Sequence, residues 1–207
     1  MALGAAAAPK LHADRLGAAL VAFLLAVGVA AHALDELGGR PLQTVLTRRV
    51  LITLATVGLA GAVAIGVAGV LVISALLLPL VVVGAFLVLA YNLELVGGRF
   101  HSDAWFALAW GGFPAFTGYF VNALEIRPEG LLVAAGCCLL SVAQRRLSTP
   151  ARELRRRTTA VAGTQQLTDG RVLELTSARL AEPLEGALSA LWLALVLLAA
   201  GLVAVRL

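Results

Sequence analysis

Long apolar blocks constrain the fold of this chain more than any other feature. Several run for about 20 residues, the length that an α-helix needs to cross a hydrocarbon core about 30 Å thick. Hydrophobic residues make up 60% of the 207 residues and charged residues only 14%, and the mean hydropathy is +0.94. Such a chain is too apolar for an ordinary soluble domain. The sequence therefore predicts an integral membrane protein.

Lipid offers no hydrogen-bond partner to an unpaired backbone group, which excludes open strands and favours helices. We predict an all-α fold, a polytopic transmembrane helix bundle with about six spans, in a single membrane domain over residues 1–207. The predicted spans are 15–34, 50–70, 71–91, 104–122, 129–143 and 186–206. The run 50–91 has no charged residue and is long enough for two spans, so a tight turn is expected near residues 69–72.

The distribution of basic residues predicts the orientation of the bundle, because Lys and Arg resist translocation. Twelve arginines fall in the loops 35–49, 92–103 and 144–185. The opposite side would carry only Lys10, Arg15, Arg127 and Arg206. The three loops are therefore expected in the cytoplasm and both termini outside the cell membrane. Charge that meets anionic lipid headgroups explains the basic composition, and no nucleic acid is predicted as a partner.

Polar residues gather in the first two of these loops, which can converge on one mouth of the bundle. The stretch "AAHALDELGGRPLQT" (30–44) holds His32, Asp35, Glu36 and Arg40, and "YNLELVGGRFHSD" (91–103) holds Tyr91, Asn92, Glu94, Arg99 and His101. The simplest interpretation is a set of helix ends that reach water, with Asp35 and Glu36 paired to Arg40. A site for a charged substrate is the alternative.

Asp35 and Glu36 are candidate metal ligands, because Mg²⁺ takes hard oxygen ligands and is often held by one or two carboxylates together with substrate phosphates. Arg40 and Arg99 are candidates for the phosphate oxygens, since guanidinium groups donate paired hydrogen bonds. Adjacent carboxylates point in different directions on a helix. Both can bind one ion only if the backbone turns there, which the glycines and proline of "GGRP" permit.

Other chemistries have little support in the sequence. His32 and His101 lack a third ligand for zinc, and there is no H-E-x-x-H motif, nucleophile elbow, P-loop or dinucleotide fingerprint. Cys137 and Cys138 are adjacent within a span, which favours a packing role. Gly111, Gly112 and Pro114 make the fourth span irregular, as expected either beside a cavity or at a packed kink.

The third loop begins with the basic stretch "RRLSTPARELRRR" (145–157). Topogenic charge at a membrane surface is the favoured interpretation and phosphate binding the alternative. Further along, Asp169–Gly170 lies between short alternating segments and predicts a small hairpin. Pro183 is expected early in the last helix.

The order of an acidic stretch followed by "RPL" at 40–42, "YN" at 91–92 and "WGGFPAFTGY" at 110–119 resembles the UbiA superfamily of intramembrane prenyltransferases. The resemblance implies Mg²⁺-assisted loss of pyrophosphate from a prenyl diphosphate and capture of the allylic cation by an aromatic or lipid acceptor. Residue by residue, the resemblance places Asp35 at a metal-binding aspartate, Arg40 in the R-P-L segment and Tyr91 at a helix-end tyrosine. Together with the residue chemistry above, the candidate site is Asp35 and Tyr91 as catalytic residues, Asp35 and Glu36 as metal ligands, and Arg40, Asn92 and Arg99 as substrate-binding residues.

The match is partial. The family's first motif has the form N-x-x-x-D-x-x-x-D, whereas positions 31 and 39 here are alanine and glycine. The second acidic motif is absent, with only Glu153 in its place, and six spans are expected rather than about nine. Three hypotheses stay open: a divergent prenyltransferase, a catalytically lapsed relative that binds an isoprenoid lipid or a membrane partner, and an unrelated small membrane protein.

Overall fold

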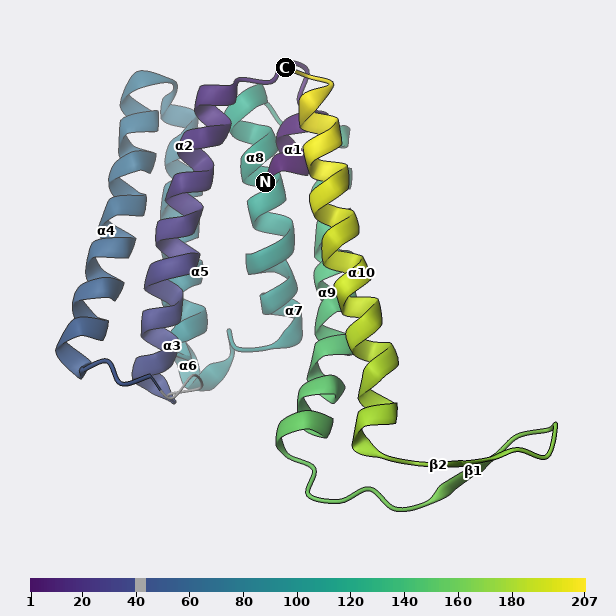
Figure 1. Cartoon of the computed structure of the whole chain (residues 1–207). Coiled ribbons are helices and arrows are strands. Elements are labelled where there is room, and N and C mark those ends of the chain that lie inside the picture. The colour runs from purple at the N-terminus through teal and green to yellow at the C-terminus, as the bar shows by residue number, and fades with distance from the viewer. Residues whose placement is uncertain (40–43) are drawn as a thin grey trace. The chain divides into compact units, whose positions relative to one another are not determined.

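The computed structural model describes residues 1–39 and 44–207 (Figure 1). Apart from one small hairpin, the described secondary structure is helical, which confirms the predicted all-α class. The chain forms two compact units. Unit 1 comprises Met1–Ser141 and Ala199–Leu207, and unit 2 comprises Val142–Leu198.

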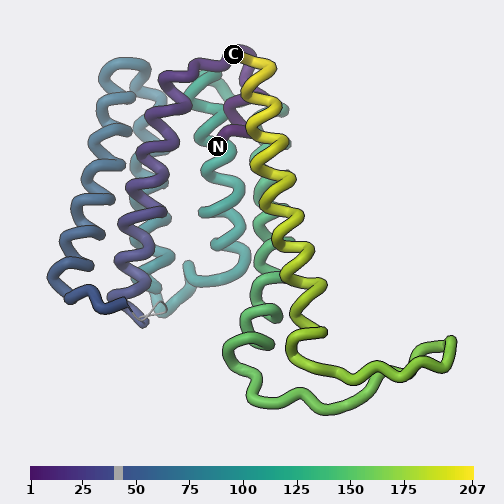
Figure 2. Tube along the Cα trace, viewed as in Figure 1, coloured from purple at the N-terminus to yellow at the C-terminus, as the bar shows by residue number. Residues whose placement is uncertain are grey.

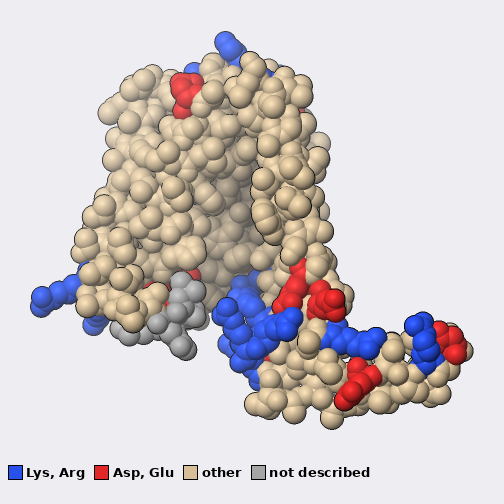
Figure 3. Space-filling model, viewed as in Figure 1, with Lys and Arg blue, Asp and Glu red and all other residues tan. Residues whose placement is uncertain are grey.

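Five helical segments in the described part of the chain are long and apolar enough to cross a membrane. They are Ala13–Gly38, Arg48–Val72, Ala75–Asn92, Pro128–Arg156 and Ser177–Ala204. Charged side chains gather near the ends of these helices, whereas their long surfaces are mostly uncharged (Figure 3). Large apolar side chains such as Leu24, Val57 and Leu197 are more than half exposed. This distribution is that of a multi-pass helical membrane protein, whose outer surface contacts lipid.

The fourth predicted span corresponds to a sixth continuous helical segment that is less apolar than these five. It consists of α7 (Asp103–Ala107), the π-helix η3 (Leu108–Gly112) and α8 (Phe113–Ala123). Tyr119 and Asn122 of α8 are 0% and 5% exposed, so this segment packs inside unit 1 and is shielded from the surroundings. Shielding by neighbouring helices explains why its sequence tolerates two tryptophans, a proline and an asparagine.

The first spanning segment is continuous through α2 (Ala13–Phe23), the π-helix η1 (Leu24–Ala31) and α3 (His32–Gly38). It packs against α4 (Arg48–Val72), where Gly58 lies against the backbone of Leu25 and Ala30. The next segment consists of a short 3₁₀ turn, η2 (Ala75–Leu77), and α5 (Leu78–Asn92), and α6 (Leu95–Gly98) follows it. The turn predicted near 69–72 lies at residues 73–74, where the Ser74 side chain caps Leu76 N–H.

A short N-terminal helix, α1 (Ala2–Ala7), turns back into unit 1 beside α8 (Figure 2). Gly4 lies against Ala115, and Gly118 lies against Met1, so missing side chains allow the two backbones to approach closely. The Arg206 guanidinium donates to the carbonyl oxygens of Ala6 and Ala8, at 3.0 and 2.9 Å. The residues that precede α2 and follow α10 therefore lie at the same end of unit 1.

The end of the chain differs from the sequence prediction for residues 144–185. Helix α9 (Pro128–Arg156) continues well past residue 143, and α10 (Ser177–Ala204) begins nine residues before 186, so only the residues between them form a loop. The stretch is rich in Ala, Leu, Arg, Glu and Gln, all strong helix formers, which explains its helicity. Pro183 consequently lies inside α10 rather than at its start.

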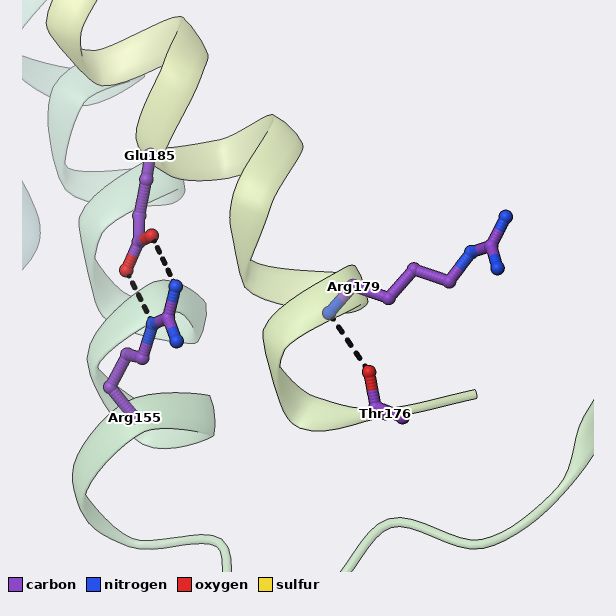
Figure 4. Close-up of polar contacts among 4 residues, drawn as sticks. All are labelled: Arg155, Thr176, Arg179 and Glu185. Atoms are coloured by element: carbon purple, nitrogen blue, oxygen red, sulfur yellow. Dashed lines mark hydrogen bonds and ion pairs between the residues drawn. The ribbon is translucent and has the colours of Figure 1, made fainter. Parts of the chain in front are cut away.

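The hairpin predicted at Asp169–Gly170 is confirmed. Strands β1 (Thr164–Gln166) and β2 (Val172–Glu174) pair antiparallel, with Gln165 opposite Leu173. Gly170 has a φ of +85°, which glycine adopts without steric cost. Within unit 2, the Arg155 guanidinium joins α9 to Glu185 of α10 through two hydrogen bonds of 2.8 and 2.7 Å (Figure 4).

Candidate functional site

Unit 1 contains an apolar cavity of about 160 Å³. Its walls come from α2 and η1, α4, α5, and η3 with α8. Small residues recur on these walls. Ala18, Ala22 and Ala26 follow each other at four-residue intervals, and Gly66 and Gly84 contribute from the facing helices. Residues four apart share one helix face, so the missing side-chain volume lines up along one side of the cavity.

The cavity extends along the bundle rather than forming a round void. Its lining runs from Arg15 to Val27 on the first helical segment, a separation of twelve residues or about 18 Å at 1.5 Å per residue. Thr117 also lines it, and the Thr117 hydroxyl oxygen is buried without a hydrogen-bond partner among the described residues. The space is therefore elongated and apolar, with a hydroxyl in its wall.

One end of the cavity adjoins the polar residues singled out in the sequence. Three lining residues contact three of those polar residues directly. The His32 Nδ1–H donates to the Val27 carbonyl oxygen at 2.7 Å, and the Asn92 side-chain amide donates to the Val88 carbonyl oxygen at 2.6 Å. The Tyr91 ring packs edge-on against Trp110, with ring centroids 5.6 Å apart. The cavity thus ends at a polar cluster, defined here as His32, Asp35, Tyr91, Asn92, Glu94 and His101.

The polar cluster is assembled from α3, the end of α5 and the segment before α7. Tyr91 and His101 stack with ring centroids 4.5 Å apart, and His101 Nδ1–H donates to the Tyr91 carbonyl oxygen at 3.2 Å. Asp35 is half-buried and lies within electrostatic range of His32, His101 and Glu94. The two predicted loops therefore do converge, as the distribution of their polar residues suggested.

The turn that carries Glu94 has an unusual backbone. Glu94, Val96, Gly97 and Gly98 all have positive φ angles, of 49°, 57°, 65° and 79°. The two glycines adopt this region freely, whereas a β-branched valine rarely does. The left-handed stretch reverses the chain within a few residues and brings His101 back over Tyr91.

Glu36 does not face the cluster as a free ligand. Its side chain is 2% exposed, and one carboxylate oxygen accepts hydrogen bonds from the backbone N–H and the hydroxyl of Thr44, at 2.7 and 2.9 Å. Asp35 and Glu36 are consecutive residues within α3, so their side chains diverge by about 100° around the helix axis. The backbone turn that a shared metal ion requires is not present between them.

Of the two carboxylates predicted to hold Mg²⁺, only Asp35 lies in the polar cluster, because Glu36 is hydrogen-bonded to Thr44. The described residues include no group of three or more His, Cys, Asp or Glu side chains that could hold a metal ion. The Arg99 side chain is exposed, and within the described residues it forms no ion pair with the carboxylates of the polar cluster. Arg40 lies outside the described residues. Asn92 is buried, and its amide group bonds to its own helix.

The sequence interpretation left a cavity beside the fourth span as one of two alternatives, and it did not use the spacing of Ala18, Ala22 and Ala26, which was a further signal. It also missed Trp110 and Thr117 as wall residues. The π-helices η1 and η3 both supply lining residues, Ala26 and Val27 from η1 and Ala109 and Trp110 from η3. Such segments are frequent at functional sites, but periodicity alone does not reveal them.

Cys137 and Cys138, both free thiols, lie where α9 packs against Gly111 and Gly112.

Comparison of the chain with protein-family models, with curated proteins and with solved structures finds no match.

Proposed function

We propose that this chain is a UbiA-like membrane protein that binds an isoprenoid lipid, with the lipid chain in the cavity of unit 1 and its polar end at the polar cluster. One observation carries the proposal: an elongated apolar cavity inside a membrane helix bundle ends at a polar cluster in which Tyr91 and Asn92 are buried and Asp35 is half-buried. The resemblance of "RPL", "YN" and "WGGFPAFTGY" to the UbiA superfamily supports the choice of an isoprenoid.

The walls of the cavity favour a hydrocarbon chain as its occupant. An apolar cavity of about 150 Å³ in a protein core stays free of water and accepts apolar molecules. The cavity here is of similar size, about 160 Å³, although it is partly open, and it is lined mainly by Ala, Gly, Val, Leu, Ile and Phe side chains. Its length of about 18 Å suits a linear chain better than a compact ring system.

The charges of the cluster favour a neutral end group. Asp35 and Glu94 are carboxylates, and they repel a diphosphate unless a metal ion lies between them. Because the described residues include no group of three metal ligands and Glu36 is bound to Thr44, we favour a hydroxyl or carbonyl end group. Asp35 can accept a hydrogen bond from a hydroxyl, and the imidazole groups of His32 and His101 can donate or accept. We therefore favour a binding protein for a neutral isoprenoid over a prenyltransferase.

A direct test is equilibrium binding of radiolabelled geranylgeraniol and of geranylgeranyl diphosphate to the purified full chain in detergent, with and without Mg²⁺. The decisive variant is Ala22→Phe, which places a ring in the middle of the cavity. Val21→Phe is the matched control, because Val21 precedes Ala22, is 50% exposed and does not line the cavity.

We expect saturable binding of geranylgeraniol that is independent of Mg²⁺, falls at least about tenfold in Ala22→Phe, and stays within about twofold in Val21→Phe. Equal effects of the two variants would refute the cavity as the binding site. Tighter, Mg²⁺-dependent binding of the diphosphate would instead support the prenyltransferase hypothesis and overturn the neutral-lipid proposal.

A further inference from the structure

Unit 2 carries an exposed arginine face that the proposed function does not use. Arg152 and Arg156 lie one helical turn apart on α9 and therefore share one face of the helix. Both are exposed, as are Arg146, Arg157 and Arg179. Figure 3 shows Lys and Arg side chains massed at this end of α9, near the hairpin. We use the name arginine face for the exposed group Arg146, Arg152, Arg156, Arg157 and Arg179. Only Arg152 and Arg156 share one side of α9, and the exposed Glu153 lies beside Arg152.

Other arginines of unit 2 have carboxylate partners. Arg155 pairs with Glu185 through two hydrogen bonds, and Arg171 pairs with Asp169 at 2.7 Å (Figure 4 for the first pair). No ion pair is present for the five members of the arginine face within the described chain. In Figure 4 the Arg179 side chain extends away from both helices. The unit thus neutralises some of its arginines internally and leaves this face positive.

Like charges one turn apart on a helix repel each other and destabilise the helix slightly. The Arg152 guanidinium makes one bond to its own helix, from Nε to the Ser148 carbonyl oxygen at 3.3 Å, so its terminal amino groups stay available. An anion between Arg152 and Arg156 relieves the repulsion and receives paired N–H donors, the geometry in which guanidinium groups bind phosphate.

The length of α9 sets the depth of this face in a membrane. The helix has 29 residues, which corresponds to about 43 Å, against about 30 Å for a hydrocarbon core and 40–45 Å for a bilayer with its headgroups. Its apolar half ends near Ala143, and the arginines occupy the half that follows. When the apolar half of α9 lies in the hydrocarbon core, the arginine face stands in the headgroup layer.

From this placement and charge we propose that the arginine face is a binding surface for the phosphate groups of anionic phospholipids. Lipid headgroups are preferred to soluble phosphates because the helix itself sets the arginines at headgroup depth. Clusters of four to eight basic residues beside a membrane span are typical of anionic-lipid recognition, and each charge contributes appreciably.

The test is native mass spectrometry of the full chain released from micelles that contain equal amounts of phosphatidylglycerol and phosphatidylcholine. The variant is Arg152→Gln with Arg156→Gln. The control is Arg48→Gln with Arg49→Gln, which removes the same charge from the start of α4, where the two arginines are also exposed. Circular dichroism and size-exclusion profiles verify that both variants fold.

We expect the wild-type chain to bind phosphatidylglycerol in preference to phosphatidylcholine, with weaker binding as salt is raised. The affinity for phosphatidylglycerol should fall about 25-fold in the double variant of α9, about fivefold for each arginine, and at most about twofold in the control. Equal affinity for the two lipids, or equal losses in the two variants, overturns the proposal. Competition by glycerol phosphate at equimolar concentration also overturns it, since the surface would then recognise free phosphate.

Discussion

The buried carboxylate of Glu36 accepts both the backbone N–H and the hydroxyl group of Thr44, at 2.7 and 2.9 Å. This pair joins α3 to the segment that precedes α4. A carboxylate with 2% exposure depends on such donors, because an ionised group without partners is strongly disfavoured in an apolar interior. Thr44→Val removes the hydroxyl donor and should lower the free energy of unfolding by about 1.5–3 kcal/mol, as measured by denaturant titration in micelles.

Thr53→Val is the control for this prediction. The Thr53 hydroxyl is exposed and donates only to the Arg49 carbonyl oxygen within its own helix, so its loss should change stability by less than about 0.5 kcal/mol. If Thr44→Val proves as mild as Thr53→Val, Glu36 does not depend on the Thr44 hydroxyl.

Replacing two glycines by alanine should change the stability of the bundle in opposite directions. A Cβ atom at Gly58 would lie 2.8 Å from the Leu25 carbonyl oxygen, whereas a Cβ at Gly17 would meet nothing within 4 Å. Gly58→Ala should therefore destabilise the bundle by about 1–3 kcal/mol, because the backbone must shift. Gly17→Ala should stabilise it by up to about 1 kcal/mol through higher helix propensity. Thermal unfolding followed by circular dichroism measures the change in stability of each variant. A stability change of the same sign in both variants would contradict the packing of α4 against η1.

Arg206 should hold α1 in place. Its two hydrogen bonds reach the carbonyl oxygens at the end of α1, which have no partner within so short a helix. Arg206→Gln should weaken the protection of the amides of residues 5–8 against hydrogen exchange about fivefold, corresponding to about 1 kcal/mol. Arg127→Gln, at an exposed pair with Glu125, serves as the comparison and should leave these amides unchanged. Unchanged exchange in both variants would show that α1 is held by packing alone.

The buried hydroxyl of Thr117 should be dispensable for folding. Its oxygen has no hydrogen-bond partner among the described residues, and a buried hydroxyl without a partner is unfavourable. Thr117→Val keeps the shape of the side chain and should raise the free energy of unfolding by about 1 kcal/mol, measured by thermal unfolding of the ligand-free chain. A fall in stability would mean that the hydroxyl is hydrogen-bonded after all.

The hairpin of unit 2 should loosen at low pH. Hydrogen bonds from the Arg171 backbone N–H and then from its guanidinium lower the pKa of the Asp169 carboxyl below its ordinary value. A lowered pKa in the folded state stabilises the hairpin above the unfolded pKa of about 3.9, and this stabilisation is lost as the pH falls through the folded pKa. An NMR titration of the full chain in micelles should give an Asp169 midpoint below about 3.9.

Asp169→Asn is the control for the titration, because its amide does not ionise and the pH-dependent shift of the neighbouring Gly170 resonance should disappear. A midpoint at or above the ordinary aspartate value in the wild-type chain would mean that the bonds from Arg171 are not maintained in solution.

The helical class and the approximate positions of the long apolar helices followed from composition and block length. Helices that are surrounded by lipid need long apolar sequences, so composition and the length of the apolar blocks indicate both the class and the positions of these helices. The full lengths of α9 and α10 could not be predicted from composition and block length. The stretch "RRLSTPARELRRR" was assigned to a loop because of its high charge. Charge determines whether a segment enters lipid, whereas helicity depends on propensity, and arginine, leucine and alanine all favour the helix.

The candidate site was partly predictable for a similar reason. The approach of Asp35 to His101, which stacks on Tyr91, followed from placing two loops at the same mouth of a bundle. The walls of the cavity could not be predicted in this way. The cavity is formed by small residues on several helices that are far apart in sequence and meet only in the folded chain. The partners of Glu36 were also unpredictable, since one helical step decides whether a carboxylate faces a site or a neighbouring backbone.

The apolar half of α9 also sets a preferred membrane thickness around this helix. Residues 130–143 are free of charge and span about 21 Å, clearly less than a typical hydrocarbon core of about 30 Å. Such hydrophobic mismatch is relieved by local thinning of the bilayer and by arginine side chains that reach outward along the helix. The chain should consequently partition into bilayers that are thinner than average, and it should thin the bilayer locally around α9.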